Sequence, residues 1–196
     1  MSVALALISL LLVPPTVARA QQPMFPPTVS PFADQTTWLL TNPFRYQILD
    51  TALVIDVPAG FVTDFASIPR GLWTLVSPHG FYSRASIIHD FLYWDQRCTR
   101  DQADRIMLIA MEESTVGLAE RKAIYAGVRA GGQSSWDDNA TSRAQGMLRT
   151  VPTKFINQVQ PLDTWPAFRA RLMQQGIREA PRTNGPPPTY CAAGNN

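Results

Sequence analysis

The sequence predicts an α+β fold, in which a small antiparallel sheet precedes a mainly helical part that contains an antiparallel helical hairpin. Two observations predict this order. Short stretches rich in β-branched and aromatic residues come first, and from Ser83 onward the apolar residues recur with helical spacing. Only three of the 17 prolines lie between residues 45 and 150, so this central part of the 196-residue chain can form regular elements around one core.

Three short extended stretches, separated by turn residues, predict the sheet. They are Thr36–Leu40, Phe44–Ile48 and Ala52–Val57. Residues 61–65 resume the extended pattern after Pro58-Ala59-Gly60. Residues 70–82 are expected to be irregular, because Pro78 and Gly80 interrupt any regular pattern there.

Four helices are expected after the strands. The first runs from Ser83, as N-cap, to about Asp95; the second begins after Thr99; the third spans Leu118–Arg129 and stops at Gly131-Gly132; the last runs from Pro166 to about Gln175. The link Gln96–Cys98 between the first two helices is short, which favours an antiparallel hairpin.

The chain divides into four predicted segments by composition. They are a signal peptide over residues 1–20, an extended N-terminal arm over 21–34, a single α+β domain over 35–150, and a proline-rich C-terminal extension with one helix over 151–196. Residues 3–13 are apolar but too short to span a bilayer, and Ala18-Arg19-Ala20 has the pattern of a cleavage site. We therefore expect a periplasmic or secreted protein, the alternative being an uncleaved membrane anchor.

The two cysteines, Cys98 and Cys191, both lie beyond the predicted cleavage site. In an oxidising compartment they are expected to form a disulfide that ties the C-terminal extension to the centre of the domain, the alternative being two unpaired thiols. The formal net charge of +2 includes no basic stripe, so nucleic acid is not an expected partner. No stretch after the signal segment is long and apolar enough to suggest a stable membrane span.

His89, Tyr93 and Asp104 form the candidate catalytic group. His89 lies about two helical turns before the link of the predicted hairpin, and Asp104 lies at a similar height after it. Tyr93 shares the face of His89, so the imidazole and the phenol can both bond the Asp104 carboxylate. A carboxylate that accepts one ring N–H fixes the tautomer and leaves the other nitrogen to act as a general base. The alternative is a buried polar clamp that locks the hairpin.

Asp90, Asp64 and Arg70 are candidate binding residues around this group. Asp90 points about 100° away from His89, where it can hold a hard cation such as Ca²⁺ or another divalent ion. Asp64 is a second candidate metal ligand, and Arg70 a candidate for holding an anionic substrate group. Alternatively, Asp64 and Ser67 satisfy backbone N–H groups in a turn while Arg70 pairs with an acid.

Two resemblances bear on the function. His89-Asp90-x-x-Tyr93 followed by Asp104 resembles the motif of secreted and parvoviral phospholipases A₂ over about twenty residues. That resemblance implies a base in His89, a calcium ligand in Asp90 and supporting roles for Tyr93 and Asp104. The glycine-rich calcium loop of those enzymes has no match here beyond Gly71 and Gly80.

The second resemblance covers about residues 50–135. The run Val57–Arg70, with His89-Asp90-Phe91-Leu92-Tyr93 and Ala103-Asp104, is similar to the family called domain of unknown function 1353, which occurs in phages and bacteria. This resemblance implies kinship and leaves the reaction open.

The sequence therefore supports two classes of function. The first is an exported hydrolase with a His-Asp site, acting on a lipid ester or a cell-envelope polymer. A metal phosphohydrolase that also recruits His79 is a variant of this enzyme hypothesis. The second is a non-catalytic envelope or phage-derived module, whose His-Asp cluster is structural and whose proline-rich arms bind a partner.

Overall fold

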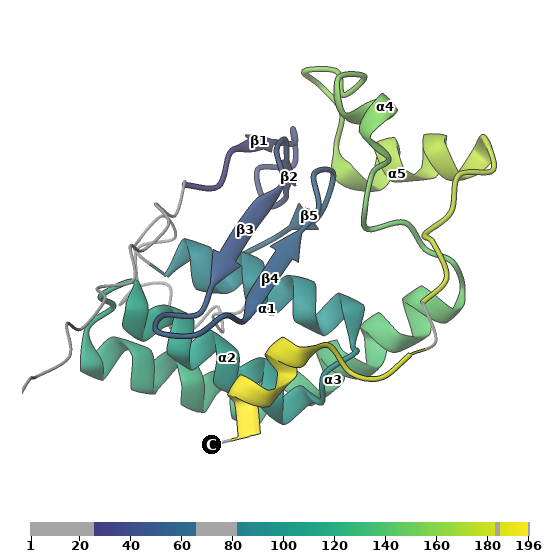
Figure 1. Cartoon of the computed structure of the whole chain (residues 1–196). Helices are drawn as coiled ribbons and strands as arrows, with labels where there is room; N and C mark the ends of the chain where they lie inside the picture. The colour runs from purple at the N-terminus through teal and green to yellow at the C-terminus, as the bar shows by residue number, and fades with distance from the viewer. Residues whose placement is uncertain (1–25, 66–81, 183–184, 196) are drawn as a thin grey trace, which may run out of the picture.

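A computed structural model describes residues 26–65, 82–182 and 185–195 of the chain (Figure 1). The predicted signal segment 1–20 and Arg70 lie outside the described residues, as does nearly all of the loop expected over residues 70–82. The described residues contain small antiparallel sheets followed by packed helices, which confirms the predicted α+β class.

The strands form two antiparallel sheets where the sequence predicted one. The first has the order β1 (Val29–Pro31), β2 (Trp38–Leu40), β5 (Val62–Thr63), and the second pairs β3 (Phe44–Gln47) with β4 (Val54–Val57). A bend at Asn42 and Pro43, which has no N–H to donate, separates β2 from β3. β1 lies within the segment expected as an extended arm, and its three residues are too few to show an alternating pattern.

The hairpin of α1 (Ser83–Asp95) and α2 (Arg100–Glu113) follows the prediction. Gln96 ends α1 in the left-handed conformation, with φ 51°. Thr99 caps α2 as expected: its hydroxyl accepts the N–H of Gln102, and the Gln102 side chain accepts the N–H of Thr99.

Two predicted helix boundaries are wrong. Ser83 is the first residue of α1, and Tyr82 holds the cap position without a side-chain hydrogen bond. α3 (Leu118–Ala144) continues through Gly131-Gly132, where an end was expected. A Cβ at Gly132 would lie 2.4 Å from the Tyr93 hydroxyl on α1, so this glycine permits a close contact between helices inside α3.

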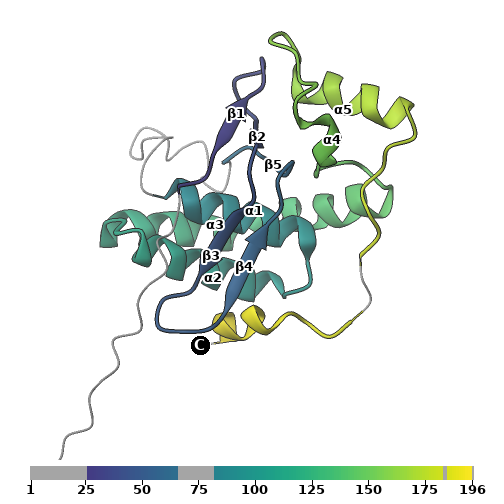
Figure 2. The ribbon, with the colours of Figure 1, turned by 45° about the horizontal axis from the view of Figure 1, so that its top comes forward.

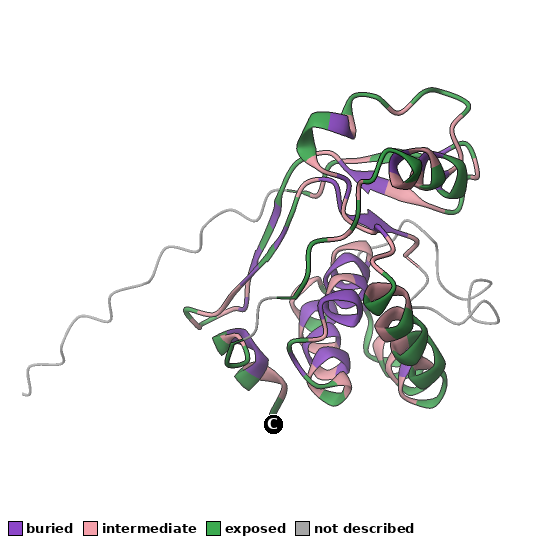
Figure 3. Ribbon diagram, turned by 90° about the vertical axis from the view of Figure 1, so that its right-hand side faces the viewer, coloured by how far each residue is buried: buried purple, intermediate pink, exposed green. Residues whose placement is uncertain are grey.

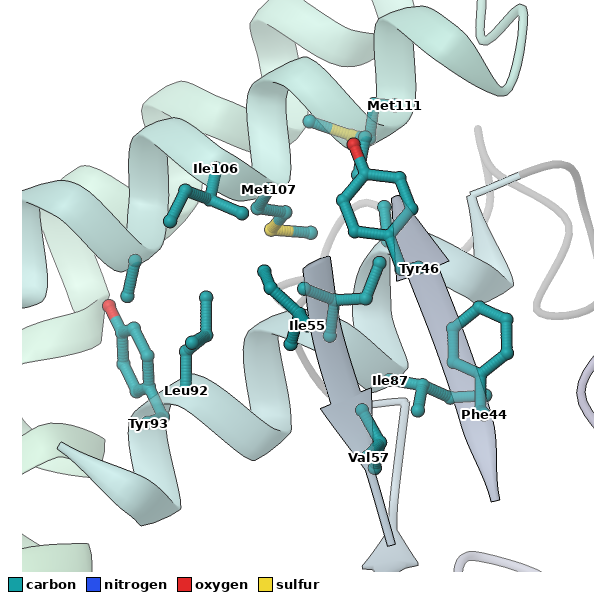
Figure 4. Close-up of a cluster of buried hydrophobic side chains, with 14 of the residues drawn as sticks. Phe44, Tyr46, Ile55, Val57, Ile87, Leu92, Tyr93, Ile106, Met107 and Met111 are labelled. Carbon is teal, nitrogen blue, oxygen red and sulfur yellow. The ribbon is translucent and has the colours of Figure 1, made fainter. Parts of the chain in front are cut away.

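The main core lies between the β3–β4 hairpin and the first two helices. Figure 4 shows Tyr46, Ile55 and Val57 of the hairpin facing side chains of α1 and α2, among them Leu92 and Met107. In Figure 3 the buried residues of the helices face this core, whereas α3 is mostly exposed along its length. This packing fixes α1 between the strands and α3. The candidate site is built around α1 and these neighbouring elements.

The C-terminal part returns to two places on the domain. α4 (Thr153–Ile156) and α5 (Trp165–Gln174) pack beside the three-stranded sheet through a second buried cluster that includes Phe32 and Phe168. The 3₁₀ helix η2 (Thr189–Asn195) lies against α2 at the other end of the molecule (Figure 2). A disulfide joins Cys98 to Cys191, as expected. None of the described helices is both long and apolar enough to cross a membrane.

Candidate active site

The Asp104 carboxylate joins α1 to α2 at the candidate site. Its Oδ1 lies 2.9 Å from Nε2 of His89 and accepts a hydrogen bond of 2.6 Å from the Tyr93 hydroxyl. His89 and Tyr93 lie one turn apart on α1, and their rings are in contact with centroids 4.0 Å apart. The structure thus brings the three predicted residues into the contacts that their spacing indicated. Their catalytic roles stay a prediction.

Two arginines hold the other oxygen of Asp104. The Arg100 guanidinium lies 3.2 Å from Oδ2, one turn before Asp104 on α2, and the Arg129 guanidinium on α3 lies 2.9 Å from the same atom. Arg129 also contacts Asp101. Sequence reasoning missed both arginines. The i,i+4 spacing of Arg100 and Asp104 was a usable signal, whereas the position of Arg129 depends on how α3 packs.

The charges around Asp104 favour an ionised carboxylate and a neutral imidazole. Burial raises the pKa of Asp104, but hydrogen bonds from His89, Tyr93 and Arg129 outweigh it and hold this pKa below its ordinary value. Burial lowers the pKa of His89, and the Arg100 charge lowers it further, against the opposing effect of Asp104. An ionised carboxylate only accepts, so the hydrogen lies on Nε2 of His89 and the lone pair on Nδ1.

Asp90 points away from Asp104, as its position on the helix predicted. Its Oδ2 accepts a hydrogen bond of 2.5 Å from the Thr63 hydroxyl on β5. That hydroxyl also accepts the N–H of Phe65, at 3.2 Å. β5 therefore fixes one oxygen of Asp90 from the sheet side, while α1 carries His89 toward α2.

A cavity of about 390 Å³ opens between α1, α3 and the end of β5. It is lined by Asp64, His89, Asp90, Tyr93, Gly127, Val128, Gly131, Gly132, Ser135, Asp138, Asn139 and Arg149. On the α3 side, Gly127, Gly131 and Ser135 follow one another at intervals of one turn, which leaves room next to the α1 residues. A Cβ added at Gly131 would meet nothing within 4 Å.

Asp64 reaches the same cavity and lies beside Arg149. The two side chains are 3.8 Å apart, and Nε of Arg149 donates to the carbonyl of Val62. The structure thus brings Asp64, His89 and Asp90 to one cavity, with an arginine that sequence reasoning missed. Among the described residues, no group of three His, Cys, Asp or Glu side chains could hold a metal ion. The proposed metal roles of Asp64 and Asp90 stay predictions.

Comparison with known proteins identifies a family over the part of the chain that holds the hairpin. Residues 38–128 match the family described as "Protein of unknown function (DUF1353)". The match supports the similarity of this chain to the DUF1353 family. It spans β2 to the middle of α3 and includes His89, Asp90 and Asp104, whereas Arg129 and Arg149 lie beyond it. Neither a curated protein nor a solved structure matches the chain.

Proposed function

We propose that this protein is an exported hydrolase that cleaves an ester, with His89 as general base and Asp104 as its orienting carboxylate. One observation carries the proposal: His89 lines the cavity while its Nε2–H is fixed on a carboxylate that the hydrogen bonds of His89, Tyr93 and Arg129 keep ionised. A neutral imidazole held in one tautomer is suited to accept a proton near neutral pH.

The reaction we propose needs only water and the ester. Nδ1 of His89 takes a proton from a water molecule as the oxygen attacks the ester carbonyl carbon, which gives a tetrahedral intermediate. The carbon–oxygen bond to the alcohol then breaks, and the imidazolium returns the proton to the leaving oxygen. Asp104 stabilises the transient imidazolium through Nε2–H, and Tyr93 holds the carboxylate in place.

The substrate we propose is a lipid ester or an ester in a cell-envelope polymer. Export to the periplasm or the exterior is supported by the signal-like sequence of residues 1–20 and, weakly, by the Cys98–Cys191 disulfide. The local phospholipase A₂ motif favours lipid. A phage origin of the protein is part of the same proposal and follows only from the family resemblance.

A divalent cation fits the described part of the site poorly. Ca²⁺ takes about six to eight oxygen ligands. Three carboxylates line the cavity, those of Asp64, Asp90 and Asp138, but among the described residues no three His, Cys, Asp or Glu side chains are grouped so that they could hold a metal ion. Thr63 already donates to one oxygen of Asp90. We therefore route no step of the reaction through a metal ion.

The test compares the two histidines of the chain. Purified protein is assayed on phosphatidylglycerol vesicles and on p-nitrophenyl butyrate, as wild type, His89→Asn and His79→Asn. Loss of a general base should lower hydrolysis by a factor of about 10²–10⁴ in His89→Asn. His79→Asn is the matched control and should keep wild-type rates. Equal rates in His89→Asn and wild type would overturn the proposal.

A second candidate is a non-catalytic envelope or phage-derived module, and burial favours it. His89 is 3% exposed and Asp104 is 0% exposed, as in a polar clamp that holds three helices together. On this hypothesis His89→Asn lowers the melting temperature by a large step, and the wild type hydrolyses neither ester. Hydrolysis by the wild type that disappears in a folded His89→Asn variant would exclude it.

A further inference from the structure

Arg149 lies in the wall of the cavity that holds His89, and both its backbone and its side chain are held in place. Its carbonyl accepts the N–H of Val62 at 3.0 Å, and its own backbone N–H donates to Glu179 at 2.7 Å. In the side chain, Nε donates to the carbonyl of Val62 at 3.0 Å, and Cζ lies 5.8 Å from the centroid of the Phe61 ring. The guanidinium is therefore fixed beside β5 before any ligand arrives.

These contacts leave the outer edge of the guanidinium to a ligand. Nη1 and Nη2 donate no hydrogen bond to a described residue, and the Asp64 carboxylate, 3.8 Å from Nη2, lies beyond hydrogen-bond distance. The guanidinium is within reach of solvent, because the side chain is 21% exposed and Arg149 contributes none of the buried, unpartnered polar atoms found among the described residues. Since Nε is occupied, a ligand meets Nη1 and Nη2, whose paired N–H groups match two oxygens of one carboxylate or phosphate.

The charges around Arg149 favour an anion. Asp64 is the one carboxylate of the described residues that lies within 4 Å of it, and its side chain is 40% exposed. Burial lowers the pKa of Arg169 on α5, and the charge of Arg149 lowers it further, so the two guanidinium groups are close enough to repel each other. Arg169 lies over the Trp165 ring, 5.5 Å from its centroid, and pairs with no carboxylate in the described part of the chain. This corner of the cavity thus has two positive charges and one negative charge.

Two further carboxylates, those of Asp90 and Asp138, belong to the cavity wall. Neither forms an ion pair with Arg149 within 4 Å, and Oδ2 of Asp90 accepts from Thr63 at 2.5 Å. Their negative charges repel an anion from the rest of the cavity. Binding of an anionic group is therefore confined to the corner at Arg149.

We propose that Arg149 binds a singly charged phosphate diester or carboxylate group of the ligand that occupies this cavity. His89 lines the same cavity, so the substrate of the hydrolase proposed above, on which this step rests, is an ester that also carries such a group. A neutral ester of the same size would leave Nη1 and Nη2 unpaired and would bind more weakly. The binding step needs no catalysis, so it can be measured separately from hydrolysis.

The experiment uses a probe that the proposed reaction cannot consume. Diethyl phosphate carries one negative charge and contains no carboxylic ester. Its titration into ¹⁵N-labelled full-length protein should shift the NMR signal of the Arg149 Nε–H with a saturating, millimolar dependence. Triethyl phosphate, which has one more ethyl group and no charge, should leave that signal in place. A parallel titration with propionate distinguishes a carboxylate from a phosphate as the preferred group.

Substitutions at this corner should change the affinity in both directions. Arg149→Gln should weaken diethyl phosphate binding about tenfold to 100-fold, measured from the backbone N–H signals of Asp64 and Asn139 in the cavity wall. Arg149→Lys keeps the charge without the paired N–H groups and should recover only part of the affinity. Asp64→Asn removes the competing carboxylate and should strengthen binding about twofold to fivefold. Arg121→Gln removes a charge from α3 at its ion pair with Glu112, and this matched control for net charge should bind like the wild type.

Three outcomes would overturn the proposal. They are an Arg149 signal that saturates with neither anion, a shift that triethyl phosphate reproduces, and binding that persists unchanged in Arg149→Gln. These outcomes are independent of hydrolysis. Saturable binding to a protein that cleaves no ester would remove the proposed reaction and keep the anion site, whereas ester cleavage without anion binding would do the reverse.

Discussion

Two carboxylates on α2 show how the charge of the partners decides what a side chain can do. Asp104, near the start of the helix, is surrounded by His89, Tyr93 and two arginines, and its pKa is lowered. Glu113, at the end of the same helix, accepts only neutral donors, the Tyr46 hydroxyl at 2.7 Å and the Leu49 N–H at 2.8 Å. Burial raises the pKa of Glu113, and these hydrogen bonds do not compensate.

The two networks also differ in what they connect. Glu113 fastens the turn after β3 to α2, which is a structural task that a neutral acceptor can perform. Asp104 joins three helices and orients an imidazole at a cavity, which needs a fixed negative charge. The comparison predicts that removing the charge of Asp104 lowers the stability of the protein strongly, whereas removing that of Glu113 changes it only weakly.

Asp104→Asn should have the largest effect. The amide removes the buried negative charge that Arg100 and Arg129 share. Breaking a buried ion pair from one side costs about 3–5 kcal/mol, and we expect the lower end of this range because both arginines are partly exposed and also reach Asp101. Urea unfolding followed by circular dichroism measures this loss. A loss below about 1 kcal/mol would mean that the arginines find solvent or another partner, and would contradict the buried-ion account.

Gly132→Ala should come second. A Cβ at this position would lie 2.4 Å from the Tyr93 hydroxyl, so α3 or Tyr93 must shift, and such overpacking typically costs about 1–3 kcal/mol. The neighbouring Gly131→Ala is the matched control, because its Cβ meets nothing within 4 Å. In a helix interior that change should stabilise the protein by up to about 1 kcal/mol. Similar stabilities for both variants would show that the Tyr93 side chain can move aside without lowering the free energy of unfolding.

Glu113→Gln should change stability by only about 1 kcal/mol at neutral pH, because the amide oxygen can still accept from Tyr46 or Leu49. The pH dependence is the sharper measurement. A carboxyl whose folded pKa is raised stabilises the fold below its unfolded pKa, and this contribution is lost as pH rises through the folded pKa. Urea unfolding at a series of pH values should show Glu113→Gln gaining on the wild type as pH rises above about 4.5.

Lowering the pH should reduce the stability of the fold through Asp104 and His89, which is opposite to its effect through Glu113. Both folded pKa values are lowered, so both groups give stability that is present above their unfolded pKa and is lost as pH falls. For His89 that loss begins below about pH 6.5. If the Glu113→Gln advantage grew toward low pH instead, the assignment of opposite pKa shifts to Glu113 and Asp104 would be wrong.

The sequence could predict contacts within a hairpin, because local spacing determines them. The contacts of His89 and Tyr93 with Asp104 follow from two helical periods and one short link, and the structure has both of them. The continuation of α3 through Gly131-Gly132 could not be read in this way. A glycine pair looks the same in sequence at a helix end and at a close helix contact, and only the packing against Tyr93 distinguishes them.

Local spacing in the sequence could not predict the site residues that come from distant segments of the chain. Arg129 is the last residue of the predicted third helix and reaches Asp104 only because α3 packs against α2, and Arg149 reaches Asp64 only through the return of the chain along β5. The division of the strands into two sheets depends likewise on a bend whose direction the local sequence does not specify. Arg100 is different: its i,i+4 spacing to Asp104 was visible and deserves its own test.

Arg100→Gln should have a small effect on stability and a clear effect on titration. Arg129 still pairs with Asp104, so the fold keeps one guanidinium on the carboxylate. The Arg100 charge lowers the pKa of His89, and its removal should therefore raise that pKa. NMR titration of the two imidazoles measures this, with His79 as the internal reference. In the proposed hydrolase, the acid limb of the rate profile should move to higher pH by the same interval, because a protonated His89 cannot accept a proton from water. A shifted His89 titration with an unmoved rate profile would separate this imidazole from catalysis and leave it to the structural clamp.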